Sequence, residues 1–194
     1  MFYDDALLVN YQDHILKVLR GLHVKNMYFR FHSPNGLSAR FINEDMAVAM
    51  FNAKFETVRI SLETADDEKQ KSHGGKVTRN EFVAAVRALF NAGYKTGEIG
   101  VYLMAGMPGQ SIDEVKESVQ FVHDNGCQAK LSLYSPIPGT EDFLKYPEQI
   151  QTQLLEEPLL QNCSIFPLYF NYINWNEYEI IKNWIDELNI TLCK

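Results

Sequence analysis

The strongest constraint on the fold is an alternation of short β-prone runs with helical segments. Each run is rich in β-branched or aromatic residues, ends in a polar loop with glycine or proline, and precedes a stretch with amphipathic helical period. The predicted strands are 27–31, 58–62, 99–103 and 129–133. Strands that alternate with helices are joined by right-handed crossovers and lie parallel, and a spacing of about 30 residues is typical of βα units. The sequence therefore predicts an α/β fold, a partial TIM-like (β/α) barrel of parallel strands.

Capping residues predict where the helices begin. Thr78 with Glu81, and Ser111 with Glu114, have the spacing of a capping box, in which each side chain bonds to the backbone amide of the other residue. Asn43 is a favourable N-cap ahead of two acidic residues. These signals predict helices that start near residues 43, 78 and 111.

The two ends of the chain depart from this rhythm. A helix is predicted over residues 10–22, directly after a strand end at 2–5, so we expect a barrel truncated at its N-terminal side. Residues 141–170 contain three prolines and are predicted to be irregular, followed by a last helix over 177–188. We expect a single domain over 1–194, with the partial barrel over about 1–143 and a C-terminal extension over about 144–194.

Charge and cysteine content limit the partners and the compartment. The chain has 18 Lys and Arg against 25 Asp and Glu, a net charge of −7, which disfavours phosphate backbones and anionic membranes. We expect a small-molecule substrate, no nucleic acid and no membrane. No apolar run is long enough for a bilayer, and the N-terminus lacks the features of a signal peptide. Three distant cysteines suggest neither a disulfide framework nor a metal site, and we expect a cytoplasmic protein.

Ligands of parallel α/β folds bind at the carboxyl ends of the strands, and this rule selects three acidic residues. Glu63 directly follows a strand, where its carboxylate can accept two hydrogen bonds from a sugar diol. It could equally cap a helix or pair with Arg59 or Lys76. Asp4 and Asp5 are adjacent, so one of them is expected to face the site, where it suits an ammonium group or a metal. An ordinary solvated turn is the alternative for this pair.

Three strand-end loops combine proline with glycine, a pattern that fixes an unusual backbone path near a ligand. They span residues 33–36, 105–110 and 134–140. The loop over 105–110 does not match the dinucleotide-binding fingerprint, and a tight βα turn explains its spacing as well.

Taken together, seven segments resemble the radical S-adenosylmethionine (radical SAM) superfamily of iron–sulfur oxidoreductases, especially the branch often joined to a cobalamin-binding domain. In the family's order they are FYDD (2–5), SPNGL (33–37), ISLET (60–64), GK (75–76), AG (92–93), YLMAGMPGQ (102–110) and YSPIPGT (134–140). The resemblance covers roughly residues 1–143.

The resemblance implies a set of positions that bind the cofactor S-adenosylmethionine. They are Asp4, Asp5, Asn35, Glu63, Lys76, Leu103, Gly106, Tyr134 and Pro136. Asp4 or Asp5 would bind the amino group of S-adenosylmethionine, and Glu63 would hold its ribose hydroxyls. The segments 103–106 and 134–136 would contact the adenine, and the other polar positions would lie nearby.

The cysteines depart from the family's pattern. The superfamily holds a [4Fe–4S] cluster on a Cys-x3-Cys-x2-Cys motif after its first strand, because such a cluster needs thiolate ligands. The cysteines here are Cys127, Cys163 and Cys193. We therefore expect a C-terminal part of a larger radical SAM enzyme, inactive by itself and unable to cleave S-adenosylmethionine. The cluster would belong to the parent protein, with cobalamin as a further candidate cofactor.

Two other functions stay open on the sequence. The chain could be a non-radical barrel enzyme that uses Asp5, Glu63 and Lys76 for acid–base chemistry, or a non-catalytic interaction module. Unpaired edge strands of an incomplete barrel also favour a homo-oligomer.

Overall fold

The computed structural model describes residues 2, 4, 6–27, 29–72 and 77–192, without the side chains of residues 67, 71 and 72. Its strands are β1 (Phe31–His32), β2 (Leu37–Ser38), β3 (Phe55–Glu63), β4 (Ile99–Ala105) and β5 (Gln128–Leu133). Its α-helices are α1 (Ile15–Val24), α2 (Glu44–Asn52), α3 (Asp67–Ser72), α4 (Arg79–Ala92), α5 (Ile112–Asp124), α6 (Glu141–Leu144), α7 (Glu148–Glu156), α8 (Phe166–Tyr169) and α9 (Trp175–Leu192). Two 3₁₀ turns are η1 (Ala39–Phe41) and η2 (Pro158–Gln161).

All described strand pairs are parallel, which confirms the predicted α/β fold of βα units. The sheet order is β1-β3-β4-β5, and β2 also pairs with β3. Ile60 in β3 pairs with Leu37 on one side and with Val101 on the other. β2 therefore lies along the edge of β3 opposite β4. The loop of residues 33–36 separates it from β1 along the chain.

The first predicted strand, over residues 27–31, is wrong in its extent. Among the described residues of this range, 27 and 29–31, only Phe31 belongs to a strand, and it pairs with Phe55, the first residue of β3. Because β3 begins at Phe55, Phe29 and Arg30 have no residue of β3 beside them. Asn26, with a φ of 53°, turns the chain just before this segment.

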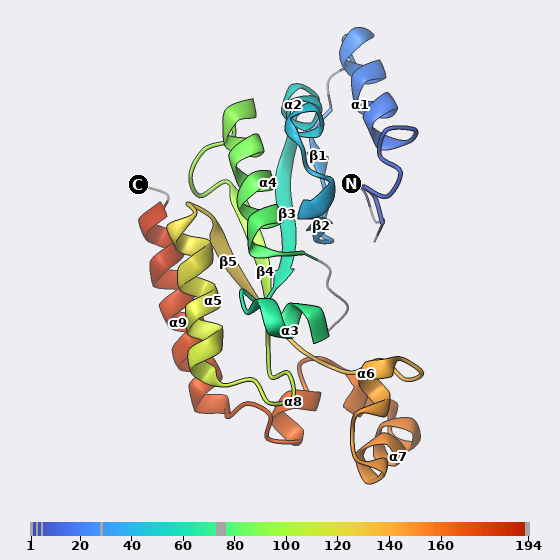
Figure 1. Cartoon of the computed structure of the whole chain (residues 1–194), viewed down its shortest axis with the longest axis vertical. Coiled ribbons are helices and arrows are strands. Elements are labelled where there is room, and N and C mark those ends of the chain that lie inside the picture. The colour runs from blue at the N-terminus through green and yellow to red at the C-terminus, as the bar shows by residue number, and fades with distance from the viewer. Residues whose placement is uncertain (1, 3, 5, 28, 73–76, 193–194) are drawn as a thin grey trace.

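The two faces of the sheet differ in polarity. Along the longer strands, buried apolar residues largely alternate with half-buried residues, most of which are polar. The buried residues include Val58, Ile60, Leu62, Val101, Leu103, Ala105 and Ala129. The half-buried residues at alternate positions include Arg59, Ser61, Glu63, Tyr102, Met104, Lys130 and Ser132. In Figure 1 helices α4, α5 and α9 stand beside the strands, and α5 and α9 pack on β4 and β5. We call the apolar side the helix-covered face and the polar side the open face, which corresponds to the interior of a complete barrel.

The predicted helix starts at the capping residues are confirmed. Both capping boxes are formed, between Thr78 and Glu81 at α4 and between Ser111 and Glu114 at α5. The Asn43 side chain accepts a hydrogen bond from the backbone amide of residue 46 at the start of α2. These caps set the entry point of each helix that covers the sheet.

The predicted helix over residues 10–22 begins later than expected, at Ile15. Residues 6–14 form turns, and Asn10 has a φ of 51°, a left-handed conformation that interrupts a right-handed helix.

The predicted irregularity of residues 141–170 is wrong. The segment forms α6, α7, η2 and α8, which lie beyond the ends of the strands at the bottom of Figure 1. Pro147, Pro158 and Pro167 sit at the N-cap or in the first turn of these elements, where the missing proline N–H costs no hydrogen bond. The segment also has its own apolar cluster, whose buried residues are Phe143, Tyr146, Leu154 and Phe166.

The final helix, α9, is longer than predicted and covers the free side of β5. Ile181 and Ile185 are its buried residues. The Asn189 side chain donates a hydrogen bond to the Ala129 carbonyl (2.9 Å) and accepts one from the Ala129 amide (3.0 Å). A side-chain amide therefore occupies the place of a further strand at this residue. In the described residues, no helix has both the length and the apolar character needed to cross a membrane.

Candidate functional site

A pocket of about 390 Å³ lies on the open face at the carboxyl ends of β3, β4 and β5. We call it the sheet-face pocket. It is lined by Pro34, Asn35, Gly36, Ser61, Glu63, Tyr102, Met104 and Ser132. Its place matches the rule that ligands of parallel sheets bind at the carboxyl ends of strands.

The loop of residues 33–36 forms one wall of this pocket and is held against the sheet. The hydroxyl of Tyr102 in β4 donates a hydrogen bond to the Pro34 carbonyl (2.8 Å). A Cβ on Gly36 would lie 1.8 Å from the Ser61 Oγ, so glycine alone permits this close approach. The buried Ser33 hydroxyl donates to the Asn35 carbonyl (3.1 Å) and stiffens the loop from within.

Glu63 occupies a special backbone position at the carboxyl end of β3. The register between β3 and β4 shifts between Ser61 and Glu63, so β3 carries an extra residue there. Glu63 itself has a φ of 67°, which for a residue with a side chain costs about 1–2 kcal/mol. Such conformations persist where the surrounding structure holds them and are common at binding sites. The bulge leaves the Glu63 side chain in the wall of the sheet-face pocket.

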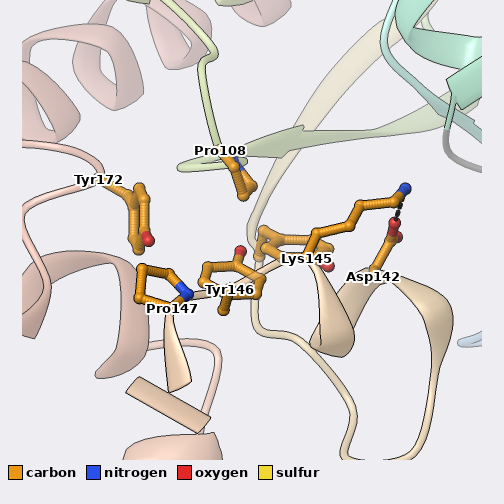
Figure 2. Close-up of a pocket in the computed structure, with 7 residues that line it drawn as sticks. Pro108, Asp142, Lys145, Tyr146, Pro147 and Tyr172 are labelled. Carbon is orange, nitrogen blue, oxygen red and sulfur yellow. Dashed lines mark hydrogen bonds and ion pairs between the residues drawn. The ribbon is translucent and has the colours of Figure 1, made fainter. Parts of the chain in front are cut away.

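A second pocket of about 360 Å³ lies between the strand ends and the C-terminal segment. We call it the tyrosine pocket (Figure 2). It is lined by Pro108, Tyr134, Asp142, Lys145, Tyr146, Pro147 and Tyr172. Burial raises the pKa of Tyr134 to about 12, and the charges of Asp142 and Glu63 add to this effect. The two pockets are neighbours, because Ser132 of the sheet-face pocket and Tyr134 of the tyrosine pocket lie two residues apart at the end of β5.

The structure brings together some of the predicted cofactor-binding residues. Asn35 and Glu63 both line the sheet-face pocket. Tyr134 lines the tyrosine pocket instead. Asp5 and Lys76 lie outside the described residues.

Three other predicted residues line neither pocket. The Leu103 side chain is fully buried on the helix-covered face, because alternation along β4 turns it away from the open face. A Cβ on Gly106 would lie 2.6 Å from the Cβ of Pro167, so the C-terminal segment covers this glycine. Pro136 is buried and is absent from both sets of lining residues.

Asp4 is also apart from the two pockets. It is exposed, and its carboxylate accepts a hydrogen bond from the Ala6 amide at 2.8 Å. This is the geometry of a local turn, which was the alternative to a binding role for this residue.

Sequence reasoning missed three residues of the sheet-face pocket that lie inside the strands: Ser61, Tyr102 and Ser132. The fourth such residue, Met104, lies in the segment 103–106 that was expected to contact the adenine. The signal was present, since Ser61 and Tyr102 each lie between two buried apolar residues. Ser132 likewise lies between the half-buried Leu131 and the buried Leu133. Polar side chains at such positions predict an open or ligand-facing side of the sheet.

The cysteines do not fit the [4Fe–4S] cluster of the radical SAM superfamily. Cys127 is buried, which raises the pKa of its thiol to about 12, whereas Cys163 is exposed. Cys193 lies outside the described residues. In the part of the chain that the structure describes, no group of three or more His, Cys, Asp or Glu side chains could hold a metal ion. These cysteines cannot supply the cluster with three thiolates from one loop.

Comparison with known proteins identifies the family. No curated protein matches the chain significantly. The family model of the radical SAM superfamily matches residues 4–122, more than half of the 194 residues. The matched span contains β1 to β4, together with seven of the eight residues that line the sheet-face pocket. On this match and its parallel βα architecture, the chain belongs to the radical SAM superfamily.

Proposed function

We propose that this chain provides the S-adenosylmethionine-binding part of a radical SAM enzyme, and that the cofactor binds in the sheet-face pocket. The observation that carries the proposal is the position of Glu63. Its carboxylate lines a pocket of about 390 Å³ at a strand end, in a bulge whose backbone is held in a costly conformation. A carboxylate accepts two hydrogen bonds, which suits the two ribose hydroxyls of the cofactor.

The other walls of the pocket suit the rest of the cofactor. The loop with Asn35 supplies polar groups on one side, while Met104 and Tyr102 offer apolar surface on the other. The lining thus combines polar and apolar groups, which can meet the polar and the apolar parts of the cofactor.

The [4Fe–4S] cluster of the superfamily supplies the electron that cleaves S-adenosylmethionine. Residues 1–194 do not offer its thiolate ligands, so we propose that cleavage requires cysteines that this sequence does not contain. The order of the seven motifs supports a place in the cobalamin-associated branch. The substrate is proposed to be a small molecule.

The role of Glu63 can be tested with two nucleosides that differ by one hydroxyl. Binding of adenosine and of 2′-deoxyadenosine is measured by saturation-transfer NMR, which detects weak complexes. A hydrogen bond to a charged group predicts that adenosine binds about tenfold more tightly than 2′-deoxyadenosine. In Glu63→Gln this preference should fall to about threefold or less, because a neutral amide is a weaker acceptor.

The matched control is Glu187→Gln, which removes the same charge from an exposed position on α9. It should retain the full preference for adenosine. Equal binding of both nucleosides to the unmodified chain, or an unchanged preference in Glu63→Gln, would contradict the proposal.

A further inference from the structure

The tyrosine pocket is a second cavity that shares no lining residue with the sheet-face pocket. Pro108 comes from the loop after β4 and Tyr134 directly follows β5. The other lining residues belong to the segment of α6 to α9, beyond the match to the family model. The C-terminal segment thus builds most of this cavity.

Flat rings dominate the walls of the tyrosine pocket. Tyr146 meets Tyr172 edge to face at a centroid distance of 5.7 Å, and it meets the buried Phe166 in the same way at 5.5 Å. Pro108 and Pro147 close the cavity from two sides (Figure 2). Rigid aromatic and proline surfaces favour a flat ring as the ligand, because offset and edge-to-face ring contacts are both available.

The hydroxyl group of Tyr146 has no hydrogen-bond partner. Tyr146 is 5% exposed, and its hydroxyl is the one buried side-chain oxygen or nitrogen of the described residues that lacks a partner. Burial and, to a smaller extent, the nearby Tyr134 phenol raise the pKa of Tyr146, but the two hydroxyls do not meet the geometry of a hydrogen bond. Figure 2 shows the Tyr146 hydroxyl directed into the space between Tyr172 and Pro108. Buried hydroxyls without a partner are costly, so this group indicates that a bound molecule supplies an acceptor.

The charges at the rim of the pocket cancel. The Lys145 ammonium group donates a hydrogen bond to the Asp142 carboxylate at 2.7 Å. Burial raises the pKa values of Tyr134, Tyr146 and Tyr172, so all three phenols keep their protons at neutral pH. An uncharged ligand therefore suits this cavity better than a charged one.

We propose that the tyrosine pocket binds an uncharged aromatic or heteroaromatic group that carries a hydrogen-bond acceptor, and that this group is the recognition element of the substrate. The acceptor receives the hydrogen bond of the Tyr146 hydroxyl. The proposal rests on the proposed function of the sheet-face pocket, since Ser132 and Tyr134, two residues apart, place the two pockets next to each other.

Two bicyclic probes of the same shape test the proposal. Quinoline has a ring nitrogen that accepts a hydrogen bond and is uncharged at pH 8, whereas naphthalene has no acceptor. We expect the purified chain to bind quinoline about fivefold more tightly than naphthalene. In Tyr146→Phe, which removes only the hydroxyl, the two probes should bind equally, with the affinity for naphthalene unchanged. Tyr169→Phe is the matched control, because Tyr169 is 59% exposed on α8 and outside the pocket.

The remaining outcomes separate the two proposals. No preference for quinoline, or a preference that survives in Tyr146→Phe, overturns the inference about the tyrosine pocket. Adenosine is also tested as a competitor of quinoline. If it displaces quinoline, and the displacement depends on Tyr146 and not on Glu63, the tyrosine pocket holds adenine and its assignment to the substrate is overturned. If the chain shows no preference for adenosine over 2′-deoxyadenosine, while its binding of quinoline still depends on Tyr146, only the cofactor proposal for the sheet-face pocket is refuted.

Discussion

Glu63 provides a stability test in which the usual order of alanine and glycine should reverse. With a φ of 67°, this residue carries the steric cost of a side chain in the left-handed region, about 1.5 kcal/mol at mid-range. Glycine removes that cost, but its greater conformational freedom in the unfolded chain lowers the free energy of unfolding by about 0.7 kcal/mol. The difference predicts that Glu63→Gly is more stable than Glu63→Ala by about 0.8 kcal/mol.

Urea denaturation of the two variants measures this difference directly. The control pair is Lys130→Gly and Lys130→Ala, because Lys130 is half-buried in β5 and is absent from the positive-φ residues. At Lys130 alanine should be the more stable replacement, by about 0.5–1 kcal/mol. Both Glu63 variants lose the carboxylate and should lose the preference for adenosine equally. The reasoning is refuted if alanine is the more stable replacement at both positions.

Two further outcomes are expected. Gly36→Ala should destabilise the chain by about 1–3 kcal/mol in urea denaturation, since its Cβ would lie 1.8 Å from the Ser61 Oγ. Adding Ser61→Ala should recover part of this lost stability. An unchanged denaturation midpoint for Gly36→Ala would contradict the close approach of this loop to β3. In a Cys193→Ser background, a thiol reagent at pH 8 should modify the exposed Cys163 within minutes and leave Cys127 unmodified. The reason is that burial raises the pKa of Cys127 to about 12. Equal modification rates of the two thiols would show that Cys127 is accessible and would contradict this prediction.

The parallel sheet and the helix starts could be predicted because their signals are local. Capping residues such as Thr78 and Ser111 act on amides three residues away, so the sequence alone indicates the bond. The strand β3 could be recognised because it is long and rich in buried β-branched residues. The position of Glu63 at the site could be predicted because it directly follows this run.

Other features depend on contacts between distant segments and could not be read locally. The length of β1 is set by where Phe55 begins the neighbouring strand. The tyrosine pocket exists because Tyr146 and Tyr172 fold back onto the loop with Pro108, and no periodic pattern records that contact. The prolines of the C-terminal segment suggested breaks in the helices, although proline is also a common first residue of a helix.

The hydrogen bonds between Asn189 and Ala129 have a consequence for how the sheet can grow. Both backbone groups of Ala129 are already occupied by a side chain, so an incoming strand would have to displace α9 before it could pair with β5. At the opposite border, the backbone amide of Phe2 donates to the carbonyl of His32 at 2.9 Å, a contact between backbone groups of the kind that a further strand makes. The barrel can therefore extend in one direction: a side-chain amide blocks pairing along the edge of β5, whereas further strands can pair along the edge of β1.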